Sequence, residues 1–203
     1  ARQTQCKNNL KQLGLAAMSH VAAQGHYPTG GWGWYWVGDA DRGFGRDQPG
    51  GWIYNLLPYV EQQALHELSA DREPDAVTET QKAGAVKMLN TALSITICPT
   101  RRRVSLYSGS TSPARNCGSN PSAVVARSDY AMNSGTNNPE ICAGPPNLAA
   151  GMSWPECAEI SDGKSCETCW PDLRTWTGLG FQRSQITPAH VRDGTSNTIL
   201  LGE

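Results

Sequence analysis

The sequence predicts an α+β fold that combines a long N-terminal helix with short strands, long loops and a disulfide-rich insertion. Three observations lead to this prediction. Apolar residues recur at helical spacing over the first part of the chain. The 203 residues include 21 glycines and 13 prolines but only 17% charged residues, a composition typical of long loops. Seven cysteines are present, most of them in the second half.

The N-terminal helix is predicted from Ala1 to about Ala23, followed by Gly25 as a stop signal. Its apolar stripe recurs at spacings of three and four residues: Cys6, Leu10, Leu13, Ala17 and Val21. The start has no good cap, and Arg2 and Lys7 place positive charge where a free helix N-terminus favours negative charge. We therefore expect the helix to continue upstream. A poorly capped terminal helix is the alternative.

A stretch rich in glycine and tryptophan follows, from Thr29 to Gly51. Trp32, Trp34 and Trp36 alternate along it, which favours an edge strand with one aromatic face.

Two further helices are expected in the middle of the chain. One runs from Pro58, a residue suited to a first turn, to Leu68. The other runs from Asp75, a good N-cap, to about Leu89. A short strand over residues 93–98 would end before a proline.

The rest of the chain predicts loops and short strands. Residues 101–127 lack periodicity and indicate a surface loop, and residues 129–133 favour a strand. Strand character returns over 178–203, with a turn at Asp193-Gly194 and an apolar strand over 198–201. We divide the chain into a helix (1–24), a head (25–135 with 173–203) and a cysteine-rich insertion (136–172).

The cysteine content favours an oxidising compartment outside the cytoplasm, where disulfides persist. The candidates for bridges are Cys6, Cys98, Cys142, Cys157, Cys166 and Cys169, and the odd total of seven leaves at least one thiol unpaired within this sequence. Residues alone do not choose the pairing. A net charge of −1 argues against nucleic acid as a partner.

Two segments resemble a bacterial family of pilin-like proteins, a domain of unknown function that follows a prepilin-type N-terminal cleavage and methylation segment. Residues 5–15 (Gln-Cys-Lys-Asn-Asn-Leu-Lys-Gln-Leu-Gly-Leu) are similar to its spine-helix signature. Residues 193–203 (Asp-Gly-Thr-Ser-Asn-Thr-Ile-Leu-Leu-Gly-Glu) are similar to its terminal strand motif. Between them, residues 56–65 and the Ile97-Cys98-Pro99 triplet match its middle landmarks in the same order.

The resemblance implies a type IV pilin or type II secretion pseudopilin architecture, with the N-terminal helix packed on a small antiparallel sheet. It implies insertion in the inner membrane through a segment upstream of this sequence, followed by assembly with identical or related subunits through the helix. Leu10, Leu13 and Ala17 would form the assembly stripe. The resemblance also implies a bridge between Cys6 and Cys98, worth ~4 kcal/mol in the chain-entropy treatment. Two buried free thiols are the alternative.

The usual catalytic motifs are missing from the sequence: it contains no G-x-S-x-G, no phosphate-binding loop and no G-x-G-x-x-G. We therefore expect a protein that is not an enzyme. Cys166 and Cys169 could form half a zinc site or a redox pair, but without a second close pair a disulfide is favoured.

The sequence also contains two weaker candidates for binding sites. Asp39, Asp41 and Asp47 have roughly calcium-loop spacing, although a bidentate Glu is missing; a solvated polar turn is the alternative. Trp32, Trp34 and Trp36 could stack on sugar rings or pack within the protein. Two functions follow: a structural subunit of a surface filament or pseudopilus, or an anchored module that binds carbohydrate or another surface protein.

Overall fold

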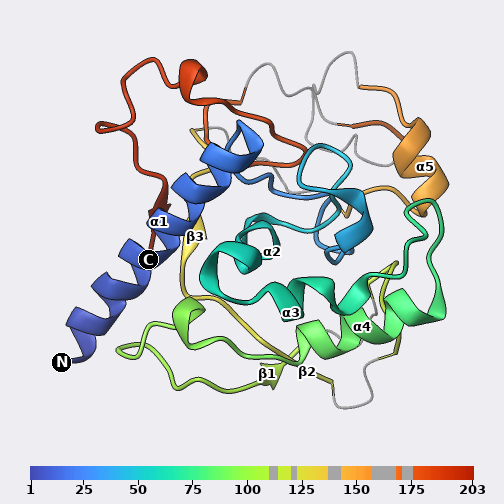
Figure 1. Cartoon of the computed structure of the whole chain (residues 1–203), viewed down its shortest axis with the longest axis horizontal. Coiled ribbons are helices and arrows are strands. Elements are labelled where there is room, and N and C mark those ends of the chain that lie inside the picture. Colours follow the sequence, from blue (N-terminus) through green and yellow to red (C-terminus); the bar gives the residue numbers. More distant parts are fainter. Residues whose placement is uncertain (110–113, 120–122, 137–142, 157–167, 171–175) are drawn as a thin grey trace.

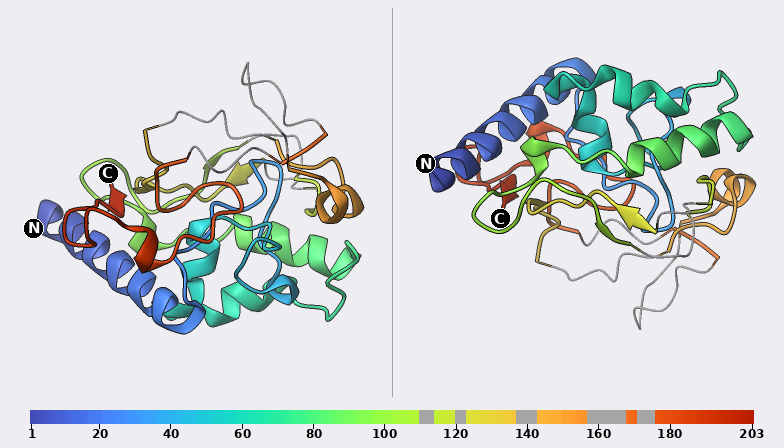
Figure 2. Two further views of the ribbon diagram at one scale, coloured as in Figure 1. Left: turned by 90° about the horizontal axis from the view of Figure 1, so that it is seen from above. Right: turned by 90° about the horizontal axis from the view of Figure 1, so that it is seen from below.

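A computed structural model describes residues 1–109, 114–119, 123–136, 143–156, 168–170 and 176–203 (Figure 1). The fold is α+β, as predicted, with helices, two small antiparallel sheets and long irregular segments. Helix α1 (Arg2–Gln24) lies along one side of the molecule, and α4 (Glu79–Leu89) and α5 (Leu148–Ser153) lie toward the opposite end (Figures 1 and 2).

The prediction of α1 is confirmed at both ends to within about one residue. Gly25 adopts the left-handed conformation (φ 80°), and its N–H donates to the carbonyl of Val21, which ends the helix. No side chain caps the first turn, and no acidic residue lies in it. The stripe expected from the sequence faces the head, because Cys6, Leu13, Ala17 and Val21 are buried.

The single helix expected from Pro58 to Leu68 is wrong. The segment forms three short elements instead: the 3-10 turn η2 (Leu57–Val60), the helix α3 (Gln63–His66) and the 3-10 turn η3 (Glu67–Ser69). A short helix, α2 (Trp52–Leu56), precedes them. Pro58 does lie in a first turn, that of η2, but Glu61 adopts a left-handed conformation (φ 61°) that ends this turn and redirects the chain.

Helix α4 starts three residues later than predicted, because Thr78 rather than Asp75 is its N-cap. The Thr78 hydroxyl accepts a hydrogen bond from the N–H of Gln81 at 3.1 Å. The strand expected over 93–98 is also wrong, since Ser94–Thr96 form a 3-10 turn, η4. The side chain of Asn9 on α1 binds the carbonyls of Ser94 and Ile97, so these groups are engaged by the helix and not by a neighbouring strand.

The two sheets are short. Strand β1 (Tyr107–Ser108) pairs with β2 (Val124–Val125), and both lie within the segment predicted as a loop. Strand β3 (Ala131–Met132) pairs with β4 (Leu201–Gly202), with Met132 opposite Leu201. The strand expected at 129–133 is therefore present in shortened form. The strand expected over 198–201 is shifted toward the C-terminus, because only Leu201 of that range pairs and residues 198–200 lie outside the strand. The second sheet adjoins α1, whose buried cluster includes Leu200 and Leu201 at its edge.

The described parts of the predicted insertion pack against the head. Leu148 of α5 and Trp170 join Trp32 and Trp36 in one buried cluster. Two 3-10 turns, η1 (Ala40–Arg42) and η6 (Pro188–His190), complete the described elements. No helix in the described ranges has both the length and the hydrophobicity that a membrane span requires.

Candidate functional site

The structure fixes α1 to the head through a disulfide near the start of the helix. Cys6 bonds Cys98, 92 residues further along the chain, as the family resemblance implied. The Thr100 hydroxyl lies 2.8 Å from the sulfur of Cys98. Both cysteines are buried, so the bridge joins the helix to the interior of the head.

Polar contacts beside the disulfide add to this attachment. The Asn9 side chain, 2% exposed, donates to the carbonyl of Ser94 at 3.2 Å and to that of Ile97 at 3.0 Å. The Tyr130 hydroxyl donates to the carbonyl of Cys6 at 3.4 Å. A buried amide that satisfies two carbonyls sets the position of the helix along its axis as well as its rotation.

The assembly stripe expected from the sequence is turned toward the protein's own head, which corrects that prediction. Leu13 and Ala17 are each 1% exposed and pack in a cluster with Leu56 and Tyr130, while Leu10 is half-buried at its edge. The fold needs an apolar stripe to hold the helix, and these residues provide it. Leu13 and Ala17 are therefore covered by the protein's own head, whereas Leu10 keeps part of its surface exposed.

The opposite face of α1 exposes apolar side chains that the sequence reasoning did not single out. Leu15 is 59% and Met18 47% exposed, and Ala22, one turn beyond Met18, is exposed as well. With the preceding Lys11, also exposed, they have the spacing of a single face of the helix. We call Lys11, Leu15, Met18 and Ala22 the outer face. The signal that could have found it is the presence of Leu15 and Met18 off the main stripe.

The C-terminal half of α1 ends in a buried aromatic cluster. The ring of His20, which is fully buried, contacts Phe44 and Tyr59 with centroids 5.6 and 5.5 Å away. Its Nδ1 donates to the carbonyl of His26 at 3.0 Å, because a carbonyl can only accept, and its Nε2 has no partner. Burial lowers the pKa of His20 to about 4, so the ring is neutral at pH 7.

The same cluster continues to α3. His66 stacks on Tyr54 with centroids 4.4 Å apart and on Phe44 at 5.3 Å. Its pKa is lowered, again mainly by burial. Phe44 therefore lies between His20 on the helix and His66 in the head, and it joins the two through ring contacts.

The edge strand expected around the tryptophans is wrong. Gly31 and Gly33 have positive φ values of 78° and 127°, and the N–H of Trp36 donates to the carbonyl of Gly33, so the chain turns here. This turn brings Trp32 and Trp36 together in the core with centroids 4.9 Å apart.

The tryptophans consequently do not form a shared exposed platform. Trp32 is fully buried and Trp36 is 6% exposed, whereas Trp34 is 65% exposed. Trp34 lies edge-on to Tyr35, with centroids 6.3 Å apart, and the guanidinium of Arg115 lies over the Tyr35 ring. Only Trp34 keeps the surface position that sugar stacking requires.

Two of the aspartates proposed as calcium ligands, Asp39 and Asp41, accept hydrogen bonds that join their loop to other segments of the head. Asp39 is 1% exposed, and its two carboxylate oxygens accept hydrogen bonds from the N–H of Asp41 and the side chain of Gln81. Burial raises the pKa of Asp39 to about 6. Asp41 accepts from the N–H groups of Asp71 and Arg72, at 2.8 and 2.9 Å.

The three aspartates do not meet at one point. Asp47 is exposed, and Asp39 and Asp41 turn their oxygens toward N–H donors. Within the described residues, the group whose potential ligand atoms lie within 4.8 Å of one another is Cys6, Cys98 and Glu203, and the disulfide already engages both sulfurs.

The remaining cysteines differ in what the structure shows of them. Cys169 is disulfide-bonded. Cys142, Cys157 and Cys166 lie outside the described residues. Cys117 is a buried free thiol whose pKa is raised by burial, which makes the reactive thiolate scarcer.

Residues 1–203 match the family described as Protein of unknown function (DUF1559), and the chain belongs to this bacterial family. Comparisons with curated proteins and with solved structures gave no match.

Proposed function

We propose that this member of the DUF1559 family is a non-catalytic, pilin- or pseudopilin-like structural subunit that assembles through the outer face of α1. The observation that carries the proposal is that the two faces of this helix have different environments. One face is bonded to the head through Cys6, Asn9 and Leu13, and the other presents Leu15 and Met18 to solvent.

An exposed apolar row on a firmly held helix suits contact with a second subunit. The disulfide and the Asn9 hydrogen bonds keep the helix from rotating, so the outer face is presented in a fixed direction. Burial of Leu15 and Met18 in a contact would remove apolar surface from water at about 25 cal/mol per Å². Lys11 beside them provides a charged group for the rim of that contact.

The expected setting is outside the cytoplasm, with the inner membrane as the anchor before assembly. The cysteine content and the Cys6–Cys98 bridge support an oxidising compartment. The membrane anchor and the filament rest on the resemblance of residues 5–15 to a spine-helix signature. Neither calcium nor another cofactor is needed for this role.

The test uses the full gene product expressed in a bacterial host, with membrane fractionation and electron microscopy of surface material. We expect membrane-associated protein and filaments or oligomers, and Met18→Glu is expected to abolish the oligomers. Met152→Glu is the matched control, because Met152 is similarly exposed (52%) but lies on α5. A strictly soluble monomer, or equal assembly by both variants, would refute the proposal.

A second candidate function is supported by Trp34 alone. An aromatic ring that is 65% exposed beside Tyr35 and Arg115 could stack on the apolar face of a sugar. A glycan array that compares the unmodified protein with Trp34→Ala separates this function from assembly. Binding that disappears with Trp34→Ala would support it, and no binding to any glycan would remove it.

A further inference from the structure

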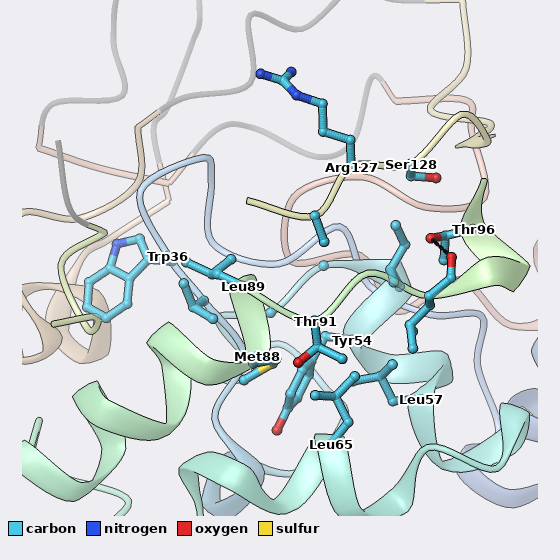
Figure 3. A pocket seen from close by; sticks show the side chains of 17 residues that line it. Trp36, Tyr54, Leu57, Leu65, Met88, Leu89, Thr91, Thr96, Arg127 and Ser128 are labelled. Carbon is cyan, nitrogen blue, oxygen red and sulfur yellow. Dashed lines mark hydrogen bonds between the residues drawn. The ribbon is translucent and has the colours of Figure 1, made fainter. Parts of the chain in front are cut away.

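An apolar cavity of about 250 Å³ lies in the head between α2, α3, the end of α4 and residues 126–128. Figure 3 shows Tyr54, Leu57, Leu65, Met88 and Thr91 gathered on one side of it. Tyr54, Leu57 and Leu65 are buried, whereas Met88 is partly exposed and Thr91 exposed. The cavity therefore has an interior floor and an open mouth.

The walls offer few free polar groups. All four hydroxyl groups in the lining donate to main-chain carbonyls at 2.8–3.0 Å, from Tyr54, Thr91, Thr96 and Ser128. The single charged residue among those that line the cavity is Arg127, which is exposed and donates to the carbonyl of Ser108. Figure 3 shows its guanidinium turned away from the other lining side chains. A charged group placed inside would meet no counter-charge.

The aromatic rings of the lining are already engaged. Tyr54 stacks on His66, and a Cβ added to Gly38 would lie 2.2 Å from its ring, so little space remains beside it. Trp36 lies against Trp32 and donates through its indole N–H to the carbonyl of Pro145. A ligand would consequently meet the aliphatic side chains that dominate the wall, among them Ile53, Leu57, Leu65, Met88 and Leu93.

Hydrogen bonds hold the frame of the cavity in place. The N–H of Ala126 donates to the carbonyl of Leu89 at 2.7 Å, and the N–H of Asp129 donates to that of Thr96 at 2.9 Å. These hydrogen bonds connect the segment 126–129 to the end of α4 and to η4. A pocket that is formed before its ligand arrives is the usual form of a small-molecule site.

We propose that this cavity binds the aliphatic chain of a small amphipathic molecule and leaves its head group in solvent at the mouth. An apolar cavity of about 150 Å³ accommodates benzene, so the volume here suits a chain of roughly ten carbon atoms. The leucines and Met88 can adapt their side chains to a flexible chain. This site would give the head of the subunit a ligand-binding role that is independent of α1 assembly.

The test is an NMR titration with 1-octanol on protein labelled with ¹³C at the methionine methyl groups. The chain has four methionines, and the two highly exposed ones, Met18 and Met152, serve as internal controls. We expect the Met88 signal to shift and saturate within the solubility of octanol, while the signals of Met18 and Met152 stay in place.

Ala126→Leu fills the cavity and is expected to weaken octanol binding at least tenfold. Ala83→Leu, the same substitution at an exposed position of α4, is expected to leave binding unchanged. Ala126→Val is a smaller change that keeps the test usable if Ala126→Leu does not fold. The absence of a saturable shift at Met88, octanol binding that both Ala126 variants leave intact, or a response to indole but not to octanol would overturn the proposal.

Discussion

The disulfide between Cys6 and Cys98 is expected to make a large contribution to the stability of this fold. It closes a loop with a sequence separation of 92 residues. In the chain-entropy treatment, a loop of this length corresponds to about 4.6 kcal/mol at 25 °C. Whole domains are stable by only about 5–15 kcal/mol, so the loss would be a large part of the total.

Cys6→Ala and Cys98→Ala should each lower the free energy of unfolding by about 4–5 kcal/mol in urea titrations. Either change removes the bridge, so the double variant should lose little more than one of them. Cys117→Ala is the matched control, since Cys117 is buried but unbonded, and its loss should be about 1 kcal/mol. Losses that add up in the double variant, or that equal the Cys117→Ala loss, would refute this reasoning.

Two further predictions concern His20 and the helical glycines. The pKa of His20 is lowered from 6.5 to about 4 in the folded protein. Between pH 6.5 and pH 4, His20 is therefore protonated in the unfolded chain but neutral in the folded protein, which favours unfolding. The unmodified protein should therefore lose about 3 kcal/mol relative to His20→Gln as pH falls through this window. Asp39, with a pKa raised to about 6, acts in the opposite direction but is common to both proteins and cancels; equal pH profiles would contradict the prediction. A Cβ on Gly84 would lie 1.9 Å from the carbonyl oxygen of Leu68, so Gly84→Ala should destabilise by about 1–3 kcal/mol. Gly14→Ala, with nothing within 4 Å, should stabilise by about 0.5–1 kcal/mol in the same urea titrations, and equal effects would contradict the packing argument.

The sequence predicted α1 well because the spacing of its apolar residues and the glycine that ends it indicate the same helix. The apolar stripe specifies the buried face, and Gly25 supplies the left-handed conformation that ends the helix. The pairing of Cys6 with Cys98 came from the family resemblance, since spacing alone leaves many pairings open. The structure supplies the reason that the pair can form, because Asn9 holds the helix beside residues 94–97.

The two strand predictions that proved wrong lie where contacts between distant parts of the chain override the local strand preference of the sequence. Trp32, Trp34 and Trp36 have the alternation of a strand, but the turn at Gly33 places the first and third in one core. A glycine with positive φ is compatible with either a bulge or a turn, and sequence does not distinguish them. The strand expected over 93–98 failed for a related reason, since its carbonyls bind a side chain of α1.

The assembly stripe predicted from the sequence, Leu10, Leu13 and Ala17, lies on the face of α1 that packs on the head. A stripe at helical spacing predicts which side is buried, and it does not say whether the covering surface belongs to the same chain or to another subunit. Here the head covers Leu13 and Ala17, so the proposed contact with a second subunit uses Leu15 and Met18, which are exposed. In this proposal, assembly and stability depend on opposite faces of one helix. A substitution on the outer face can therefore test assembly without loosening the head, and this separation makes Met18→Glu informative.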